Sequence, residues 1–256
     1  MIDDALNFAN DLADKVRPVL LRAFHEGAHY QKKDDGSPVT ATDREVEMIL
    51  RDAIARRFPE HGILGEEFGA TGAERSCVWV LDPIDGTRAF SAGLPCFGCL
   101  ISLCVDGVPV VGVIELPVAG LRALGAKGCA TLCNRTPVRT RDCRDLAHAV
   151  LGDWTNNTSM PDPPGKARLN EAVNWSIRDG GCANYVSLAR GYVDICIDGN
   201  LDPYDFCALV PVVEGAGGCI TDWRGAPLTM ASGSLVVASA TMDCHRAALE
   251  LLHRFD

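Results

Sequence analysis

The richest chemistry in this chain lies in the segment at 78–87, which reads VWVLDPIDGT. A short apolar strand is expected to place Asp82 at its C-terminal end, and the proline and glycine that follow favour a tight turn. In such a turn, the side chains of Asp82 and Asp85 can converge on one point, which the carbonyl of Ile84 also faces. Oxygen ligands without a neighbouring His or Cys suit Mg²⁺ better than zinc. A turn that merely caps the following helix is the alternative.

The helix expected after this turn adds a second kind of chemistry. It would begin at Thr87, and the unpaired N–H groups of a first helical turn attract phosphate. Three further acidic segments lie where predicted strands or helices begin or end: GEE at 65–67, PVTATD at 38–43 and LDPYD at 201–205. Each acidic residue alone is more often a cap or a solvated loop residue, but four such clusters in one chain favour a shared site.

The elements that must position these residues form a mixture of helices and strands. Helices are expected at 3–26 and from Thr42 to Arg57, with Thr42 and Glu45 as a capping-box pair. Strands are expected at 62–64, 77–81, 98–105 and 110–116. The C-terminal half alternates helices at 184–190, 205–215 and 243–254 with strands at 193–197 and 235–238. This mixture predicts α+β layers rather than one wound sheet.

The same pattern predicts two parts. Residues 1–147 would form an N-terminal α+β part that carries the GEE and DPIDGT segments. Residues 148–256 would form a C-terminal α/β part that carries the later acidic segment. The loop expected at 156–166 would lie near the junction.

Composition excludes several classes of protein. The chain has 256 residues, 47% of them hydrophobic, which is ample for a core and excludes intrinsic disorder. No apolar run could span a bilayer, and the acidic N-terminus is unlike a signal or transit peptide, so a cytoplasmic protein is expected. The net charge of −10 disfavours nucleic acid and anionic membranes. It is compatible with a small phosphorylated metabolite if metal ions neutralise the carboxylates.

The twelve cysteines are spread irregularly between Cys77 and Cys244. Many stand inside apolar runs, where a cysteine packs like a small hydrophobic residue. Cys96 and Cys99 form a C-x-x-C motif, but the βαβ pattern of a redox site does not accompany it. Reduced, buried thiols are therefore expected.

The segment HEGAH at 25–29 matches the H-E-x-x-H signature of zinc proteases. Gly27 lies inside the motif and weakens a helix by about 1 kcal/mol relative to Ala. No third ligand pattern follows downstream. Exposed residues at a helix end are therefore expected here.

Taken in order, VTATD, GEE, DPIDGT and the late PYD…EGAGG resemble the signatures of the inositol monophosphatase family, Mg²⁺-dependent and lithium-sensitive phosphomonoesterases. The resemblance covers nearly the whole chain, from residue 33 to the C-terminal strands. It implies a layered αβαβα sandwich of the inositol monophosphatase/fructose-1,6-bisphosphatase type, usually a homodimer.

The resemblance also implies roles for individual residues. Two or three Mg²⁺ ions would be held in each active site by Glu66, Asp82, Ile84 (through its carbonyl), Asp85 and Asp205. Catalysis would fall to Glu66 and to the pair Thr87 and Asp43, which would orient the attacking water. The substrate would be bound by Gly86, Thr87, Gly181, Asp198 and Asp202.

Spacing separates this reaction from that of phosphatases which form an aspartyl-phosphate. Those enzymes carry their two aspartates in D-x-D, whereas Asp82 and Asp85 stand three apart with a proline between them. Direct attack of a metal-activated water, without a covalent intermediate, is therefore expected.

The substrate is predicted from a narrower resemblance. The segments at 82–103 and 201–225 are similar to the histidinol-phosphatase branch, which acts in histidine biosynthesis. Asp198 and Asp202 would suit the amine and imidazolium of L-histidinol phosphate. However, Asp198 also matches a family position that binds inositol hydroxyls, and Gly181 stands where an Asp is expected in this branch. Inositol 1-phosphate or another small phosphomonoester therefore stays open, as does a catalytically silent binding or regulatory protein.

Overall fold

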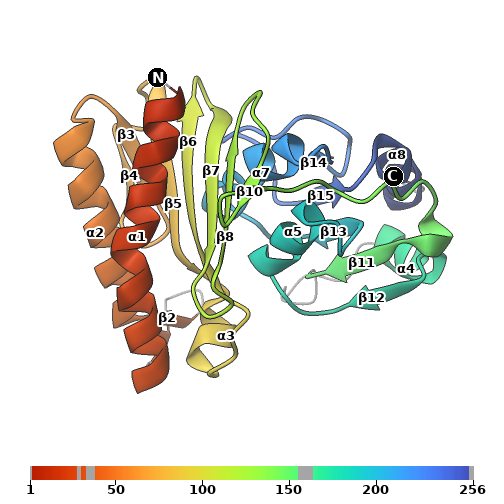
Figure 1. Ribbon diagram of the computed structural model, residues 1–256, viewed down its shortest axis with the longest axis horizontal. Coiled ribbons are helices and arrows are strands. Elements are labelled where there is room, and N and C mark those ends of the chain that lie inside the picture. Colours follow the sequence, from red (N-terminus) through yellow and green to blue (C-terminus); the bar gives the residue numbers. More distant parts are fainter. Residues whose placement is uncertain (1, 28–29, 33–37, 155–163, 254–256) are drawn as a thin grey trace.

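The computed structural model describes residues 2–27, 30–32, 38–154 and 164–253. Their helices and strands stack in five layers: two helices, an eight-stranded sheet, central helices, a five-stranded sheet, and two outer helices (Figure 1). The expected layered αβαβα sandwich of the α+β class is thereby confirmed.

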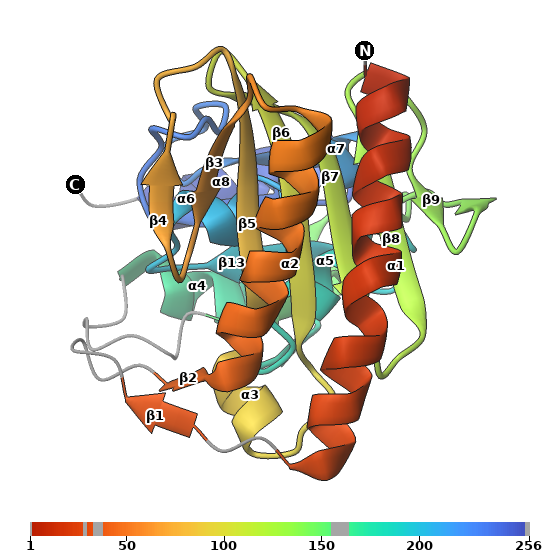
Figure 2. The same ribbon diagram turned by 90° about the vertical axis from the view of Figure 1, so that its left-hand side faces the viewer.

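The first layer contains α1 (Ile2–Glu26) and α2 (Ala41–Arg57), which lie side by side on the outer face of the large sheet (Figure 2). Apolar residues recur every three or four positions in α1 and are buried. The capping box of α2 is wrongly predicted: Thr40 is the N-cap, and its partner is Asp43. Asp43 is buried, together with the other residues of α2 that face the sheet.

The large sheet has the order β10-β9-β8-β7-β6-β5-β3-β4. Only β3 and β5 pair in parallel, and all other neighbours are antiparallel. Its strands are β3 (Gly62–Gly65), β4 (Gly69–Thr71), β5 (Cys77–Asp85), β6 (Gly98–Val105), β7 (Val108–Leu116), β8 (Leu121–Ala126), β9 (Leu132–Cys133) and β10 (Thr136–Pro137). Four of these strands were expected; β5 extends further than predicted, to Asp85. A separate pair, β1 (Tyr30–Lys32) and β2 (Pro38–Thr40), precedes α2.

The second sheet has the order β12-β11-β13-β15-β14. Its strands are β11 (Val150–Asp153), β12 (Trp175–Ile177), β13 (Ile195–Asp198), β14 (Cys219–Asp222) and β15 (Val236–Ser239). The helices around it are α4 (Pro164–Ala172), α5 (Cys182–Ala189), α6 (Pro203–Phe206), α7 (Leu209–Gly215) and α8 (Met242–His253). Between the two sheets lie α5 and α7, whereas α4 and α8 cover the far side (Figure 1).

Two expectations for this half need correction. The helix predicted at 205–215 is broken into two: α6 ends just before Cys207, and α7 begins after it, at Leu209. The loop predicted at 156–166 lies mostly outside the described residues, but its end is wrong, because Lys166 belongs to α4.

One hydrophobic cluster joins the two sheets. It contains Val78 and Leu100 of the large sheet together with Val236 and Ala238 of the small one. The helices α5 and α7 fill the space between them with buried aliphatic side chains. The proposed division after residue 147 therefore stays a prediction, since the two parts share this core.

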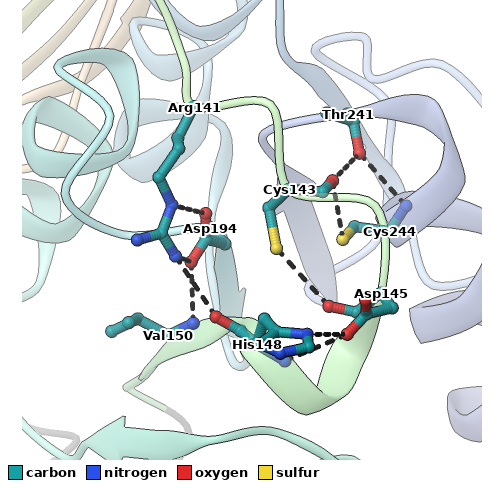
Figure 3. A network of polar contacts seen from close by, with 8 residues as sticks. All are labelled: Arg141, Cys143, Asp145, His148, Val150, Asp194, Thr241 and Cys244. Carbon is teal, nitrogen blue, oxygen red and sulfur yellow. Dashed lines mark hydrogen bonds and ion pairs between the residues drawn. The ribbon is translucent and has the colours of Figure 1, made fainter.

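A polar network anchors the segment between the sheets (Figure 3). The carboxylate of Asp194 is buried, pairs with Arg141, and accepts a hydrogen bond of 2.8 Å from the Val150 amide. The carbonyl of Cys143 accepts hydrogen bonds from Thr241 Oγ1 and from Cys244 Sγ. These contacts tie the segment that leads into β11 to the start of β13 and to the start of α8.

The structure also places the cysteines and the HEGAH segment. All twelve cysteines are free thiols, and Cys99 is buried in β6. The helix α1 ends at Glu26 with His25 exposed, while His29 lies outside the described residues. Within the described ranges, no helix combines the length and apolarity needed to cross a bilayer.

Candidate active site

Three carboxylates meet where the large sheet faces the second half of the chain. Asp82 and Asp85 come from the end of β5, and Asp205 comes from α6. One oxygen of each lies within 4.8 Å of the others; Asp82 is buried, and the other two are partly exposed. Residues three apart on a regular strand point to opposite faces. The register shift between Asp82 and Asp85 breaks this alternation, and the irregularity lets both side chains reach one point.

The electrostatics of this group favour a cation. Burial raises the pKa of Asp82 well above its usual range, and the charges of Glu66, Asp205, Asp85 and Asp43 raise that pKa further. Burial likewise raises the pKa of Asp205. In the described part of the chain, Oδ1 of Asp82 is buried and has no hydrogen-bond partner. A hard divalent cation would supply that partner and offset the repulsion, so the donor set fits Mg²⁺.

Thr87 and Asp43 lie next to this acidic group. Thr87 Oγ1 is 3.3 Å from Asp43 Oδ1 and 3.0 Å from the carbonyl oxygen of Ile84. The other oxygen of Asp43 accepts a hydrogen bond of 2.8 Å from the amide of its cap partner, Thr40. Burial raises the pKa of Asp43. The hydroxyl of Thr87 therefore lies between two acceptors, the Asp43 carboxylate and the Ile84 carbonyl, and can donate its one hydrogen bond to either.

Two glycines of the predicted substrate site are helix N-caps. Gly86 precedes α3 (Thr87–Ser91) and has φ +85°, a left-handed conformation that glycine adopts at little cost. Gly181 precedes α5 with φ +47° and ψ −132°. A Cβ on Gly181 would lie 2.9 Å from Oδ2 of Asp85. The same oxygen accepts a hydrogen bond of 2.8 Å from the amide of Cys182.

The two predicted leaving-group acids occupy different surroundings. Asp198 is buried at the end of β13, and its pKa is raised well above the usual range by burial and by the charges of Asp85 and Asp205. Asp202 is exposed, and Tyr204 donates to its carboxylate over 2.8 Å. The Asp202 amide donates to Asp205 Oδ2 over 2.7 Å, so Asp202 contacts the acidic group through its main chain.

The structure thus brings most of the predicted site residues to one place, and leaves the Asp202 carboxylate at the surface. Sequence reasoning missed Cys182 and Thr40. Cys182 acts through its main-chain amide, which no residue type signals. Thr40 could have been found from its spacing to Asp43, which matches a capping box.

Comparison with known proteins assigns this arrangement to a family. The family model described as "Inositol monophosphatase family" matches residues 1–254. The chain belongs to the inositol monophosphatase family. The expected family membership is confirmed, and with it the expectation of a phosphatase, a hydrolase of phosphoric monoesters. Members of this family use metal ions, typically Mg²⁺, and the acidic group described above could hold one.

Relatives within the family carry different names. The bifunctional phosphatase IMPL2 of Arabidopsis thaliana, a chloroplastic protein, is 40% identical over 95% of this chain and 73% of its own length. A histidinol-phosphatase of Chlorobaculum parvum is 32% identical over 93% of both chains. Among solved structures, an inositol monophosphatase from Zymomonas mobilis superposes with a TM-score of 0.89 at 35% identity, covering 98% of each chain.

Proposed function

We propose that this phosphatase hydrolyses L-histidinol phosphate to L-histidinol and phosphate, with Mg²⁺ as its cofactor, as a step of histidine biosynthesis. In the reaction, water adds to phosphorus, the ester P–O bond breaks, and the alkoxide takes up a proton. The observation that carries the proposal is a further aspartate, Asp198, which is buried and close enough to the three carboxylates for the charges of Asp85 and Asp205 to act on it.

The carboxylates of Glu66, Asp82, Asp85 and Asp205, with the carbonyl of Ile84, would hold the metal. Bound Mg²⁺ neutralises phosphate charge, makes a bound water easier to deprotonate, and stabilises the leaving oxygen. The unpartnered oxygen of Asp82 and the proximity of three carboxylates support this assignment. The bond from Cys182 to Asp85 leaves the second oxygen of Asp85 available as a ligand.

The pair Thr87 and Asp43 would handle the proton of the attacking water. Thr87 Oγ1 would accept a hydrogen bond from this water and donate a hydrogen bond to Asp43 Oδ1, which lies 3.3 Å away. Asp43 is buried and has a raised pKa, so it is a better proton acceptor than an exposed aspartate. The amides of Gly86 and Thr87 would contact the phosphate.

The choice of substrate rests on charge. L-Histidinol carries an amine and an imidazole, both of which are cationic when protonated. A buried aspartate near two others favours a cationic group, because a cation stabilises the carboxylate form that burial, and then the charges of Asp85 and Asp205, disfavour. The histidinol-phosphatase of Chlorobaculum parvum and the bifunctional phosphatase of Arabidopsis thaliana add support from similarity.

Inositol 1-phosphate is the second candidate. An aspartate can also accept hydrogen bonds from inositol hydroxyls, and Gly181 leaves no side chain to select a cation at that position. The likeness to the Zymomonas mobilis inositol monophosphatase supports this alternative.

The kinetic comparison of the two substrates tests the proposal. We expect kcat/KM with Mg²⁺ to favour L-histidinol phosphate by about 100-fold, or nearly 3 kcal/mol. Replacement Asp198→Asn should reduce kcat/KM for L-histidinol phosphate more than for inositol 1-phosphate, and Asp52→Asn is the matched control at an exposed acid outside the site. Equal or reversed preference in the wild type would refute the assignment of substrate.

The proposal extends to two or three Mg²⁺ ions per active site, inhibition by Li⁺, a homodimer, and a cytoplasmic location. Light scattering of the purified protein checks the dimer. Phosphate release at increasing LiCl, with KCl as the control, checks the inhibition.

A further inference from the structure

A buried glutamate outside the acidic group binds the loop that carries Glu66. Glu47 lies one helical turn after Asp43 on α2, and its side chain is fully buried. Its Oε2 accepts a hydrogen bond of 2.7 Å from the amide of Glu67. Its Oε1 accepts a hydrogen bond of 3.2 Å from the amide of Phe68. A single carboxylate thus binds two consecutive amides immediately after Glu66.

The backbone of Glu66 is also held from the other side. Its amide donates to the carbonyl of Leu81 on β5 over 3.2 Å. Three consecutive N–H groups, those of residues 66 to 68, therefore have fixed acceptors. Main-chain hydrogen bonds on both sides of a residue limit the directions in which its side chain can leave the loop.

Two neighbours hold Glu47 in this position. Arg51, one further turn along α2, donates to Glu47 Oε1 over 2.7 Å and also donates to the carbonyl of Gly69. Gly65 gives the carboxylate room, because a Cβ on Gly65 would lie only 2.0 Å from Glu47 Oε1. The loop at 65–69 is therefore tied to α2 by hydrogen bonds from two of its amides to Glu47 and from Arg51 to the carbonyl of Gly69, while the ion pair within α2 holds the Glu47 carboxylate in place.

We infer that Glu47 is a positioning residue, which orients Glu66 toward the metal by binding the loop amides of residues 67 and 68. The inference rests on the proposed metal site. Glu66 is close enough to that site for its charge to act on both Asp82 and Asp205. Helix α2 then contributes two residues to the site: Asp43 contacts Thr87, and Glu47, one turn later, holds the loop that carries Glu66. Mutation of a residue that holds a metal ligand in place by hydrogen bonds typically lowers metal affinity by about 10–100-fold.

Direct metal binding tests the inference without recourse to activity. The metal-free protein is titrated with Mn²⁺, and free Mn²⁺ is followed by electron paramagnetic resonance. Glu47→Gln offers one acceptor oxygen where the carboxylate offered two, so one of the two loop amides faces an NH2 group and loses its acceptor. The ion pair with Arg51 is also removed, and we expect the Mn²⁺ dissociation constant to rise by about 10–100-fold. Glu45→Gln makes the same chemical change at a half-exposed position of the same helix and should bind Mn²⁺ like the wild type.

A kinetic measurement adds a second readout. Because Glu47 touches neither substrate nor metal in this proposal, excess Mg²⁺ should return the kcat of Glu47→Gln to within a few-fold of the wild type. The Mg²⁺ concentration needed for half-maximal rate should rise in parallel with the Mn²⁺ dissociation constant. Normal Mn²⁺ affinity in a folded Glu47→Gln protein would overturn the inference, even if its melting temperature were lower.

A second variant covers the case in which Glu47→Gln does not fold. Arg51→Met keeps Glu47 but removes the ion pair and the bond to Gly69, and we expect the Mn²⁺ dissociation constant to rise about threefold or more. Unchanged affinity in that variant would then overturn the inference. Failure of the proposed metal site is distinguishable: in that case the wild type itself binds no Mn²⁺, or Asp85→Asn binds it equally well.

Discussion

Replacement of Gly181 by alanine should disturb the acidic group through a single added carbon. Gly181 has φ +47° and ψ −132°, a conformation that residues with a Cβ adopt only with strain of about 1–3 kcal/mol. The new Cβ would also lie 2.9 Å from Asp85 Oδ2, where ordinary contact begins near 3.4 Å. The Asp85 carboxylate would therefore have to move by about half an ångström or more.

That movement has a predictable effect on catalysis. It would lengthen the bond from the Cys182 amide to Asp85 and displace one oxygen of the proposed metal site. Displacements of about 1 Å in an active site can lower rates by about 100-fold, so we expect kcat/KM of Gly181→Ala to fall by about 10–100-fold. Urea unfolding should show a loss of about 1–3 kcal/mol. The assay is phosphate release under saturating Mg²⁺.

Gly128 offers a matched control for this variant. It has φ +80°, and no atom lies within 4 Å of the position that its Cβ would take. Gly128→Ala should therefore lose stability through backbone strain alone, by about 1–2 kcal/mol, and keep its activity. Activity of Gly181→Ala within twofold of the wild type would refute the reasoning, because it would mean that Asp85 need not move.

Three further predictions concern stability. Asp194→Asn should lower the free energy of unfolding by about 1.5–3 kcal/mol, the usual contribution of a hydrogen bond to a charged group. A larger loss is not expected, because Arg141 is half exposed and water can solvate its charge once the partner is gone. Urea titration measures the loss. The pKa of His245 is lowered by burial, and its ring contacts Thr221 and Ser239, so the folded state disfavours its protonation. Stability should therefore fall as the pH drops below about 6.5, by about 1.4 kcal/mol for each unit of pKa difference, and His245→Gln should weaken this dependence. Removal of metal with EDTA should lower the melting temperature relative to the Mg²⁺-loaded protein, since a ligand at 100 times its dissociation constant stabilises by about 2.7 kcal/mol; equal melting curves would contradict a bound metal.

Much of the site could be predicted because its chemistry lies in short contiguous segments. The spacing of Asp82 and Asp85 indicated convergence, and the structure brings both together with Asp205. The mechanism of that convergence was not predictable, because the turn was expected after the strand, whereas β5 continues through an irregularity as far as Asp85. A register shift depends on pairing with β6, which local sequence does not specify.

A long-range contact and an overlooked proline account for the rest of what sequence reasoning missed. The bond from Cys182 to Asp85 joins residues 97 positions apart and uses a main-chain amide. The break between α6 and α7 falls in an apolar run that reads as one continuous helix. Cys207 and Ala208 keep helical dihedral angles there, but Pro211 has no N–H with which to bond the carbonyl of Cys207. The proline is a local signal of this break, whereas the main-chain donor of Cys182 has no signature in residue type.

Mg²⁺-dependent release of phosphate from L-histidinol phosphate, measured for the wild type and Asp85→Asn, tests the central claim most directly. The account predicts release by the wild type that EDTA abolishes and Mg²⁺ restores, and a loss of about 100-fold or more in Asp85→Asn. Release that persists in EDTA, or that is equal in Asp85→Asn, would contradict the assignment of catalysis to this acidic group.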